Sequence, residues 1–141
     1  MVRVQSQPLD PWAEIAAHER RHQQWVGTFG ATAVFIGSLR DFNQGQVVAE
    51  MSLEHYPGMT EKHLEKVIRE ASDRWEILEP LVIHRYGRLV PADPIVLVAV
   101  WSAHRDVAFR ACRYIIDELK TRAPFWKHEQ TATGRRWVIP E

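Results

Sequence analysis

The chain has 141 residues, of which 45% are hydrophobic and 26% charged, and its 18 basic and 18 acidic side chains give a formal net charge of zero. This length suits one hydrophobic core, so we expect a single domain over residues 1–141. A net charge of zero excludes the basic excess typical of proteins that bind nucleic acid or membrane surfaces.

The N-terminus, the apolar runs and the cysteine content predict the cellular location of the protein. Residues 1–12 lack the apolar core of a signal peptide, and the longest apolar run, residues 95–101, is too short to span a bilayer. Cys112 is the single cysteine, which excludes an intramolecular disulfide and suits a reducing compartment. We therefore expect a soluble cytoplasmic protein.

In the first half of the chain, the sequence predicts a helix followed by two strands. Asp10 before Pro11 is typical of an N-cap and first turn, and predicts a helix that runs to about Gln24. Residues 31–37 are apolar and β-rich, as in a buried strand, and residues 47–55 alternate as a half-buried strand does. The polar residues 41–46 between them predict a mobile loop.

A second helix and two further strands follow. Thr60 predicts the cap of a helix that ends near Trp75, and its apolar residues keep the spacing of a core face. Residues 80–86 and 95–101 then predict two strands, separated by a turn at residues 91–94.

A long helix is predicted near the C-terminus. Ser102 is expected to cap it, residues 103–122 to form it and Pro124 to end it, with residues 125–129 extended. This alternation of helices and strands indicates an α/β or α+β fold with helices packed against one sheet.

Two positions are candidates for binding an anion. Arg40 follows a predicted strand, where ligand contacts are common, although from position alone a solvated loop arginine fits better. His104 and Arg105 fall in the first turn of the long helix, whose free N–H groups favour an anion. The alternative for this pair is an ion pair with a nearby carboxylate such as Asp106.

Two lysines are candidates for reactive groups. Lys120 lies in the last predicted helical turn, where a cation also simply complements the helix dipole. Lys127 stands between aromatic residues and a histidine, and desolvation there would lower its pKa and prepare it for proton transfer or covalent chemistry. The alternative is an ordinary surface lysine. These residues predict an anion site and reactive amines, but no particular reaction.

A resemblance supplies the reaction. The segments in question are FIGSLRDFN (35–43), LEHYPGM (53–59), VIHRYG (82–87), SAHRDVAF (102–109) and LKTRAPFWKHE (119–129). In this order and spacing they resemble the large-subunit family of molybdopterin synthase over about residues 30–137. The resemblance implies an α+β fold similar to an α/β hammerhead, in which helices pack on a mixed sheet and a small β subdomain is added.

The resemblance also implies the activity and the partners. Proteins of this family form a homodimer within a heterotetramer, with a small ubiquitin-like sulfur-carrier subunit on each large subunit. The carrier's C-terminal Gly-Gly thiocarboxylate delivers sulfur to cyclic pyranopterin monophosphate, which becomes the dithiolene of molybdopterin in molybdenum cofactor biosynthesis. We expect no cofactor and no metal in this sulfurtransferase.

Residue by residue, the resemblance implies that Lys120 and Lys127 are catalytic. The residues that it implies for substrate binding are Ser38, Leu39, Arg40, His104, Arg105, His128 and Glu129. The position of Ser38 is often basic in relatives, and Ala92-Asp93-Pro94 departs from the family's usual glycine-acid turn.

The predicted long helix has a consequence for the site. His104 and Lys120 are 16 residues apart, which corresponds to about 24 Å along an unbroken helix. A small pterin cannot contact both in one chain. We therefore predict a site shared between two subunits, in which the lysines of one chain face His104 and Arg105 of the other.

Two alternatives remain. His18-Glu19-Arg20-Arg21-His22 is a literal H-E-x-x-H on a predicted helix, as in zinc hydrolases, although the segment is very polar for a buried catalytic helix. The other alternative is a non-catalytic module that binds a Gly-Gly-ended ubiquitin-like protein without turnover.

Overall fold

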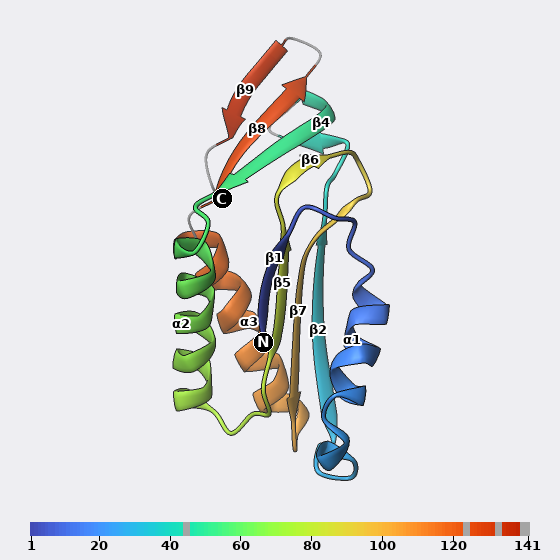
Figure 1. Ribbon diagram of the computed structural model, residues 1–141, viewed down its shortest axis with the longest axis vertical. Helices are drawn as coiled ribbons and strands as arrows, with labels where there is room; N and C mark the ends of the chain where they lie inside the picture. Colours follow the sequence, from blue (N-terminus) through green and yellow to red (C-terminus); the bar gives the residue numbers. More distant parts are fainter. Residues whose placement is uncertain (44–45, 123–124, 132–133, 139–141) are drawn as a thin grey trace.

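The protein consists of a larger sheet flanked by helices and a smaller sheet beyond one end of it (Figure 1). The computed structural model describes the backbone of residues 1–43, 46–122, 125–131 and 134–138, and side chains within 1–41 and 50–122. In these ranges no helix is both long enough and apolar enough to cross a membrane.

The larger sheet has four strands in the order β1-β5-β7-β2. They are β1 (Val2–Gln5), β5 (Leu81–Arg85), β7 (Pro94–Ser102) and β2 (Ala31–Ser38). β1 pairs with β5 in parallel and the other two pairings are antiparallel, so the sheet is mixed, as expected.

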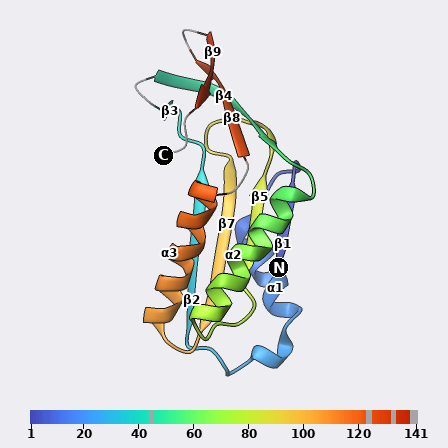
Figure 2. The same cartoon turned by 90° about the vertical axis from the view of Figure 1, so that its left-hand side faces the viewer.

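Helices cover both faces of this sheet. α2 (Met59–Arg74) and α3 (Arg105–Arg122) lie on one face, while α1 (Pro11–Arg20) and the short 3₁₀ helix η1 (Gln23–Trp25) lie on the other (Figures 1 and 2). The expected packing of helices on one mixed sheet is confirmed.

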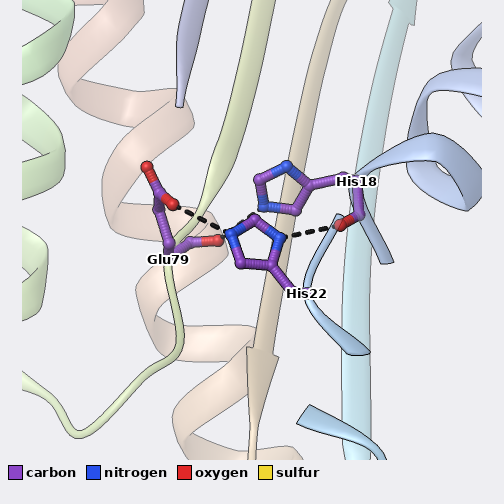
Figure 3. Close-up of side chains that lie close together, drawn as sticks. All are labelled: His18, His22 and Glu79. Atoms are coloured by element: carbon purple, nitrogen blue, oxygen red, sulfur yellow. Dashed lines mark hydrogen bonds and ion pairs between the residues drawn. The ribbon is translucent and has the colours of Figure 1, made fainter. Parts of the chain in front are cut away.

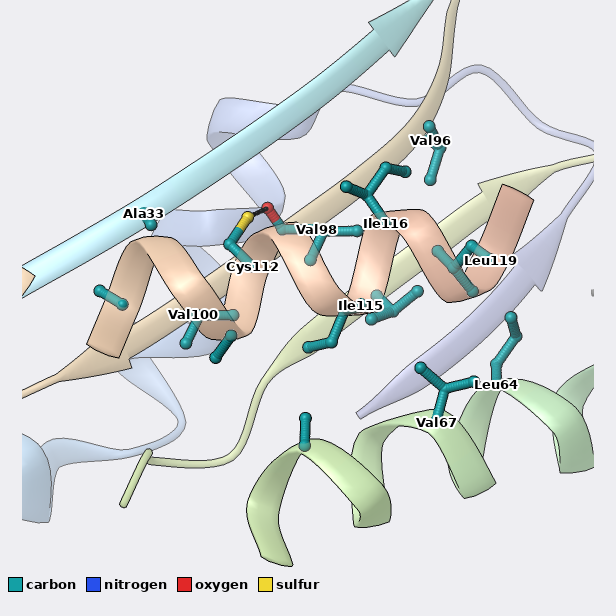
Figure 4. Close-up of a cluster of buried hydrophobic side chains, with 14 residues drawn as sticks. Ala33, Leu64, Val67, Val96, Val98, Val100, Cys112, Ile115, Ile116 and Leu119 are labelled. Atoms are coloured by element: carbon teal, nitrogen blue, oxygen red, sulfur yellow. Dashed lines mark hydrogen bonds between the residues drawn. The ribbon is translucent and has the colours of Figure 1, made fainter. Parts of the chain in front are cut away.

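The main core lies between the sheet and the pair α2 and α3 (Figure 4). α3 contributes a buried stripe at helical spacing, namely Ala108, Ala111, Cys112, Ile115, Ile116 and Leu119. Full burial of one such leucine or isoleucine contributes about 1.5–3 kcal/mol. Burial also raises the pKa of the Cys112 thiol to about 11, so this cysteine is a core residue and not a thiolate nucleophile.

The smaller sheet confirms the added β subdomain. Its path is β3 (Phe42–Asn43), β4 (Gln46–His55), β8 (Phe125–Thr131) and β9 (Gly134–Val138), and β6 (Gly87–Leu89) also pairs with β4. Leu39, Met51, Leu53 and Leu89 are buried together beneath it. This small core joins the subdomain to the end of β2.

The end of α1 and the start of α2 differ from the predictions. Asp10 caps α1 as expected, with its carboxylate accepting from the Ala13 N–H at 3.2 Å, but α1 ends at Arg20. Thr60 is not the cap of α2, because its Oγ1 accepts from the Tyr56 N–H. Gly58, with φ of 82°, takes the cap position.

The start of α3 was also predicted wrongly. Ser102 is the last residue of β7, and its hydroxyl donates to the Glu76 carbonyl oxygen at 3.1 Å. His104 precedes the helix, and its backbone carbonyl oxygen accepts from the Ala108 N–H. The expected loop at 41–46 is partly replaced by the β3–β4 pairing, and residues 44–45 lie outside the described ranges.

Candidate functional site

The register of the larger sheet separates the candidate residues into two groups. Ala31 at the start of β2 pairs with Ser102, whereas Ser38 at its end pairs with Pro94. The seven steps between these positions correspond to about 23 Å of strand. Ser38, Leu39 and Arg40 therefore lie at one end of the sheet, and His104 and Arg105 follow its other end.

Backbone hydrogen bonds hold the segment that carries Arg40. Leu39 is buried, its N–H donates to the Asp93 carbonyl oxygen at 3.0 Å, and its carbonyl oxygen accepts from the Ala92 N–H at 2.8 Å. Ser38 and Arg40 on either side of it are exposed. The buried leucine thus anchors the chain while its neighbours face solvent.

Lys120 lies in the last turn of α3, at the end that adjoins the smaller sheet (Figure 2). Its side chain is exposed. Arg122 binds Glu70 at 2.7 Å and also pairs with Glu118, while Asp117, three residues before Lys120, pairs with Arg113. Lys120 makes no ion pair among the residues whose side chains are described.

A second network fixes the helix that carries Lys120. Glu70 on α2 accepts from the Tyr114 hydroxyl at 2.7 Å and from Arg122, and both bonds lower the pKa of that carboxyl. Arg74 lies over the Tyr114 ring at 4.4 Å. These contacts tie the C-terminal half of α3 to α2.

Lys127, His128 and Glu129 follow on β8, the first strand after α3. Lys127 is opposite Leu53 of β4, His128 opposite Ser52 and Glu129 opposite Met51. The side chains of these three residues lie outside the described ranges. The prediction that the Lys127 side chain is desolvated therefore concerns a side chain outside those ranges. By position, Lys120 and Lys127 stand on either side of the connection from α3 to β8.

His104 and Arg105 stand at the opposite end of α3. Both side chains are exposed. Asp106, the carboxylate considered as a partner, instead pairs with Arg110 at 3.1 Å. The ion-pair alternative that used Asp106 is therefore wrong, and a basic pair remains beside the N–H groups of the first helical turn.

The distance between the two groups follows from the helix. α3 runs unbroken from Arg105 to Arg122, so His104 and Lys120 are separated by about 24 Å of rise. Arg40, the other candidate for binding an anion, lies at the same end of the larger sheet as Lys120. One chain does not bring the whole predicted set together.

The H-E-x-x-H alternative lacks the geometry of a zinc hydrolase. α1 ends at Arg20, so His22 lies beyond the helix. The Glu19 carboxylate accepts from the Trp101 indole N–H at 2.9 Å and is not free to act as a base. A cavity of about 410 Å³ does lie beside α1 and η1, and Glu19 and His22 line it, but none of the residues that the resemblance implies for catalysis or substrate binding does.

Sequence reasoning missed the contribution of Asp93. Its carbonyl oxygen accepts from Leu39, and its carboxylate accepts from the Val90 N–H at 2.9 Å and lies 3.5 Å from Arg85. The departure from the family pattern at residues 92–94 was the available signal.

Comparison with known proteins gives a consistent family. Residues 4–122 match the family model described as MoaE protein. A molybdopterin synthase catalytic subunit of Ralstonia nicotianae is 56% identical, covering 97% of this chain and 76% of the relative. One of Pseudomonas aeruginosa is 54% identical over 97% and 89%. The solved MoaE structure from Burkholderia ambifaria has a TM-score of 0.81 at 48% identity, over 98% and 88% of the two chains.

Proposed function

This chain belongs to the MoaE family of molybdopterin synthase catalytic subunits, and from that membership we propose that Lys120 and Lys127 carry its sulfur-transfer chemistry. The single observation that supports this most directly is the position of Lys120. It is an exposed cation in the last turn of α3, shortly before β8, and it makes no ion pair among the residues whose side chains are described.

The reaction assigned to these lysines joins two anionic molecules. A thiocarboxylate at the C-terminus of a small carrier protein gives its sulfur to cyclic pyranopterin monophosphate. Cationic amines stabilise the approaching thiocarboxylate, and they can transfer protons at the carbons that receive sulfur or hold the acyl group covalently. Two such transfers complete the dithiolene.

The substrate-binding residues take two positions in this proposal. His104 and Arg105 bind the phosphate, together with the free N–H groups at the start of α3. Ser38, Leu39 and Arg40 border the lysine end, where Arg40 contacts the pterin or the carrier's tail. His128 and Glu129, beside Lys127 on β8, complete that end.

The partners follow from the same chemistry. We propose a ubiquitin-like carrier with a C-terminal Gly-Gly thiocarboxylate, and a homodimer of this chain at the centre of a cytoplasmic heterotetramer. The name "catalytic subunit" carried by the relatives supports a second kind of subunit. The distance of about 24 Å between His104 and Lys120 supports a site built by two chains.

The test is reconstitution with thiocarboxylated carrier and cyclic pyranopterin monophosphate, followed by measurement of molybdopterin. Lys120→Ala should lower the rate by at least about 100-fold, because it removes a group that acts on the reacting atoms. The matched control is Lys62→Ala, an exposed lysine on α2, which should keep the wild-type rate.

Carrier binding distinguishes the catalytic role from a binding role. Titration of carrier into Lys120→Ala should give a dissociation constant close to that of wild type. A normal rate in Lys120→Ala would refute the assignment. Loss of carrier binding in step with the lost rate would favour the non-catalytic binding module for a Gly-Gly-ended protein.

A further inference from the structure

A cluster of three potential metal ligands lies on the face of the larger sheet opposite α3. His18 is on α1, His22 lies just beyond that helix, and Glu79 is in the connection from α2 to β5. One donor atom from each lies within 4.8 Å of the other two (Figure 3). This cluster has no part in the proposed sulfur transfer.

The hydrogen bonds of His22 leave one ring nitrogen facing a carboxylate. Its Nδ1 is 2.7 Å from the His18 carbonyl oxygen, which can only accept, so Nδ1 carries a proton. Its Nε2 is 3.2 Å from Oε2 of Glu79. A metal ion could bridge these two atoms, because imidazole nitrogen and carboxylate oxygen are both common metal ligands.

His18 supplies a buried imidazole beside this pair. Its side chain is 0% exposed, and its Nε2 is 3.0 Å from the Glu79 carbonyl oxygen. Its Nδ1 has no hydrogen-bond partner among the described residues. Burial, the largest effect, lowers the pKa of His18.

We propose that His18, His22 and Glu79 form a binding site for a divalent transition metal, with Zn²⁺ as the best fit. Two imidazoles and one carboxylate are a common zinc donor set, and solvent would supply the fourth ligand. His18 would bind through Nε2 while its proton moves to Nδ1. The bond from His22 Nδ1 to the His18 carbonyl oxygen is the outer contact that orients a ligating histidine.

The surroundings allow an ion to enter. The side chains of His22 and Glu79 are 17% and 52% exposed, and His22 also lines the cavity beside α1 and η1. The ammonium of Met1 lies 3.1 Å from Oε1 of Glu79, which leaves Oε2 for the ion. That positive charge weakens binding, so we expect a micromolar rather than a picomolar site.

The role we assign to this metal is structural. Glu19, the residue that would be the base of an H-E-x-x-H motif, accepts a hydrogen bond from the Trp101 indole N–H instead. An ion bound here would join the end of α1 to the connection between α2 and β5. Its loss should therefore affect stability and leave the environment of Lys120 unchanged.

The test uses metal-free, full-length protein and zinc chloride in isothermal titration calorimetry at pH 7.5. We expect one Zn²⁺ per chain, and His22→Ala and Glu79→Gln should each weaken binding by about 10–100-fold. The matched control is His63→Ala, an exposed histidine on α2, which should bind as wild type does. The variants change partly exposed side chains, and circular dichroism would check their fold.

A second readout identifies the geometry. Co²⁺ in place of Zn²⁺ should give the visible absorption of a four-coordinate site in wild type and in His63→Ala, but not in Glu79→Gln. Zinc should also raise the melting temperature of wild type more than that of Glu79→Gln. Absence of saturable binding, or equal binding by wild type and both ligand variants, would overturn the proposal.

Discussion

Ala92 has an unusual backbone conformation for a residue with a side chain. Its φ is 77°, in the left-handed region, and it is the only residue other than glycine with positive φ among the described residues. Its N–H donates to the Leu39 carbonyl oxygen, so the strained turn supports the segment that carries Arg40. The strain is thus located next to a proposed substrate-binding residue.

Ala92→Gly should stabilise the protein by about 0.5–1 kcal/mol, because relief of Cβ strain exceeds the extra flexibility of glycine in the unfolded chain. Urea unfolding should show a higher midpoint with an unchanged slope. Ala103→Gly, at an exposed position without positive φ, is the control and should give no gain. A lower midpoint for Ala92→Gly would contradict this account.

At the scale of elements, the sequence predicted those that have a strong apolar pattern of their own. α2, α3, β2, β4, β5 and β7 all appeared within a few residues of their expected bounds. β1, β6 and β9 were missed because they are short and none has the continuous apolar run that marked the five-residue β5. These strands form because distant partners pair with them.

The same limit applies to the candidate site. The rise of one helix predicted the separation of His104 from Lys120. The location of Arg40 depends instead on the antiparallel register of β2 and β7, which brings Ser38 opposite Pro94. That register is a property of two segments far apart in sequence, and no local pattern contains it.

Gly30 positions the start of α3. Its N–H donates to the Ser102 carbonyl oxygen at 3.0 Å, and a Cβ at this position would lie 2.4 Å from the Ala103 carbonyl oxygen. Backbone cannot yield as a flexible side chain does. The glycine therefore permits the close approach that fixes the residues just before His104.

Gly30→Ala should destabilise the protein by about 1–3 kcal/mol, because the added methyl group must displace backbone. It should also raise the KM for the cyclic precursor, since the displaced segment leads directly into His104 and Arg105. Thr32→Ala, an exposed change on β2 just after Gly30, should affect both far less. Unchanged melting temperature and KM in Gly30→Ala would count against this role.

At the scale of the whole molecule, the larger sheet keeps the two groups of proposed site residues apart. The lysines and Arg40 lie at the end next to the smaller sheet, and His104 and Arg105 at the other end of α3. A second chain placed so that its α3 start meets the lysine end would complete a site. Two-fold symmetry would then give two equal sites per dimer.

Subunit complementation tests this arrangement. Lys120→Ala and Arg105→Ala should each be inactive alone. Co-expressed with different tags, they should recover about one quarter of wild-type activity, because half of randomly formed dimers are mixed and each mixed dimer has one intact site of two. Lys120→Ala with Lys127→Ala should recover nothing, because both lysines come from the same chain at each site.

A second complementation pair tests at which end of the shared site Arg40 acts. If Arg40 acts at the lysine end of its own chain, co-expression of Lys120→Ala with Arg40→Ala leaves every mixed dimer with two damaged sites and no activity. If it acts with His104 and Arg105, the same pair recovers about one quarter. Recovery there would contradict the grouping that the β2–β7 register implies, while failure of the Lys120→Ala and Arg105→Ala pair would refute the shared site itself.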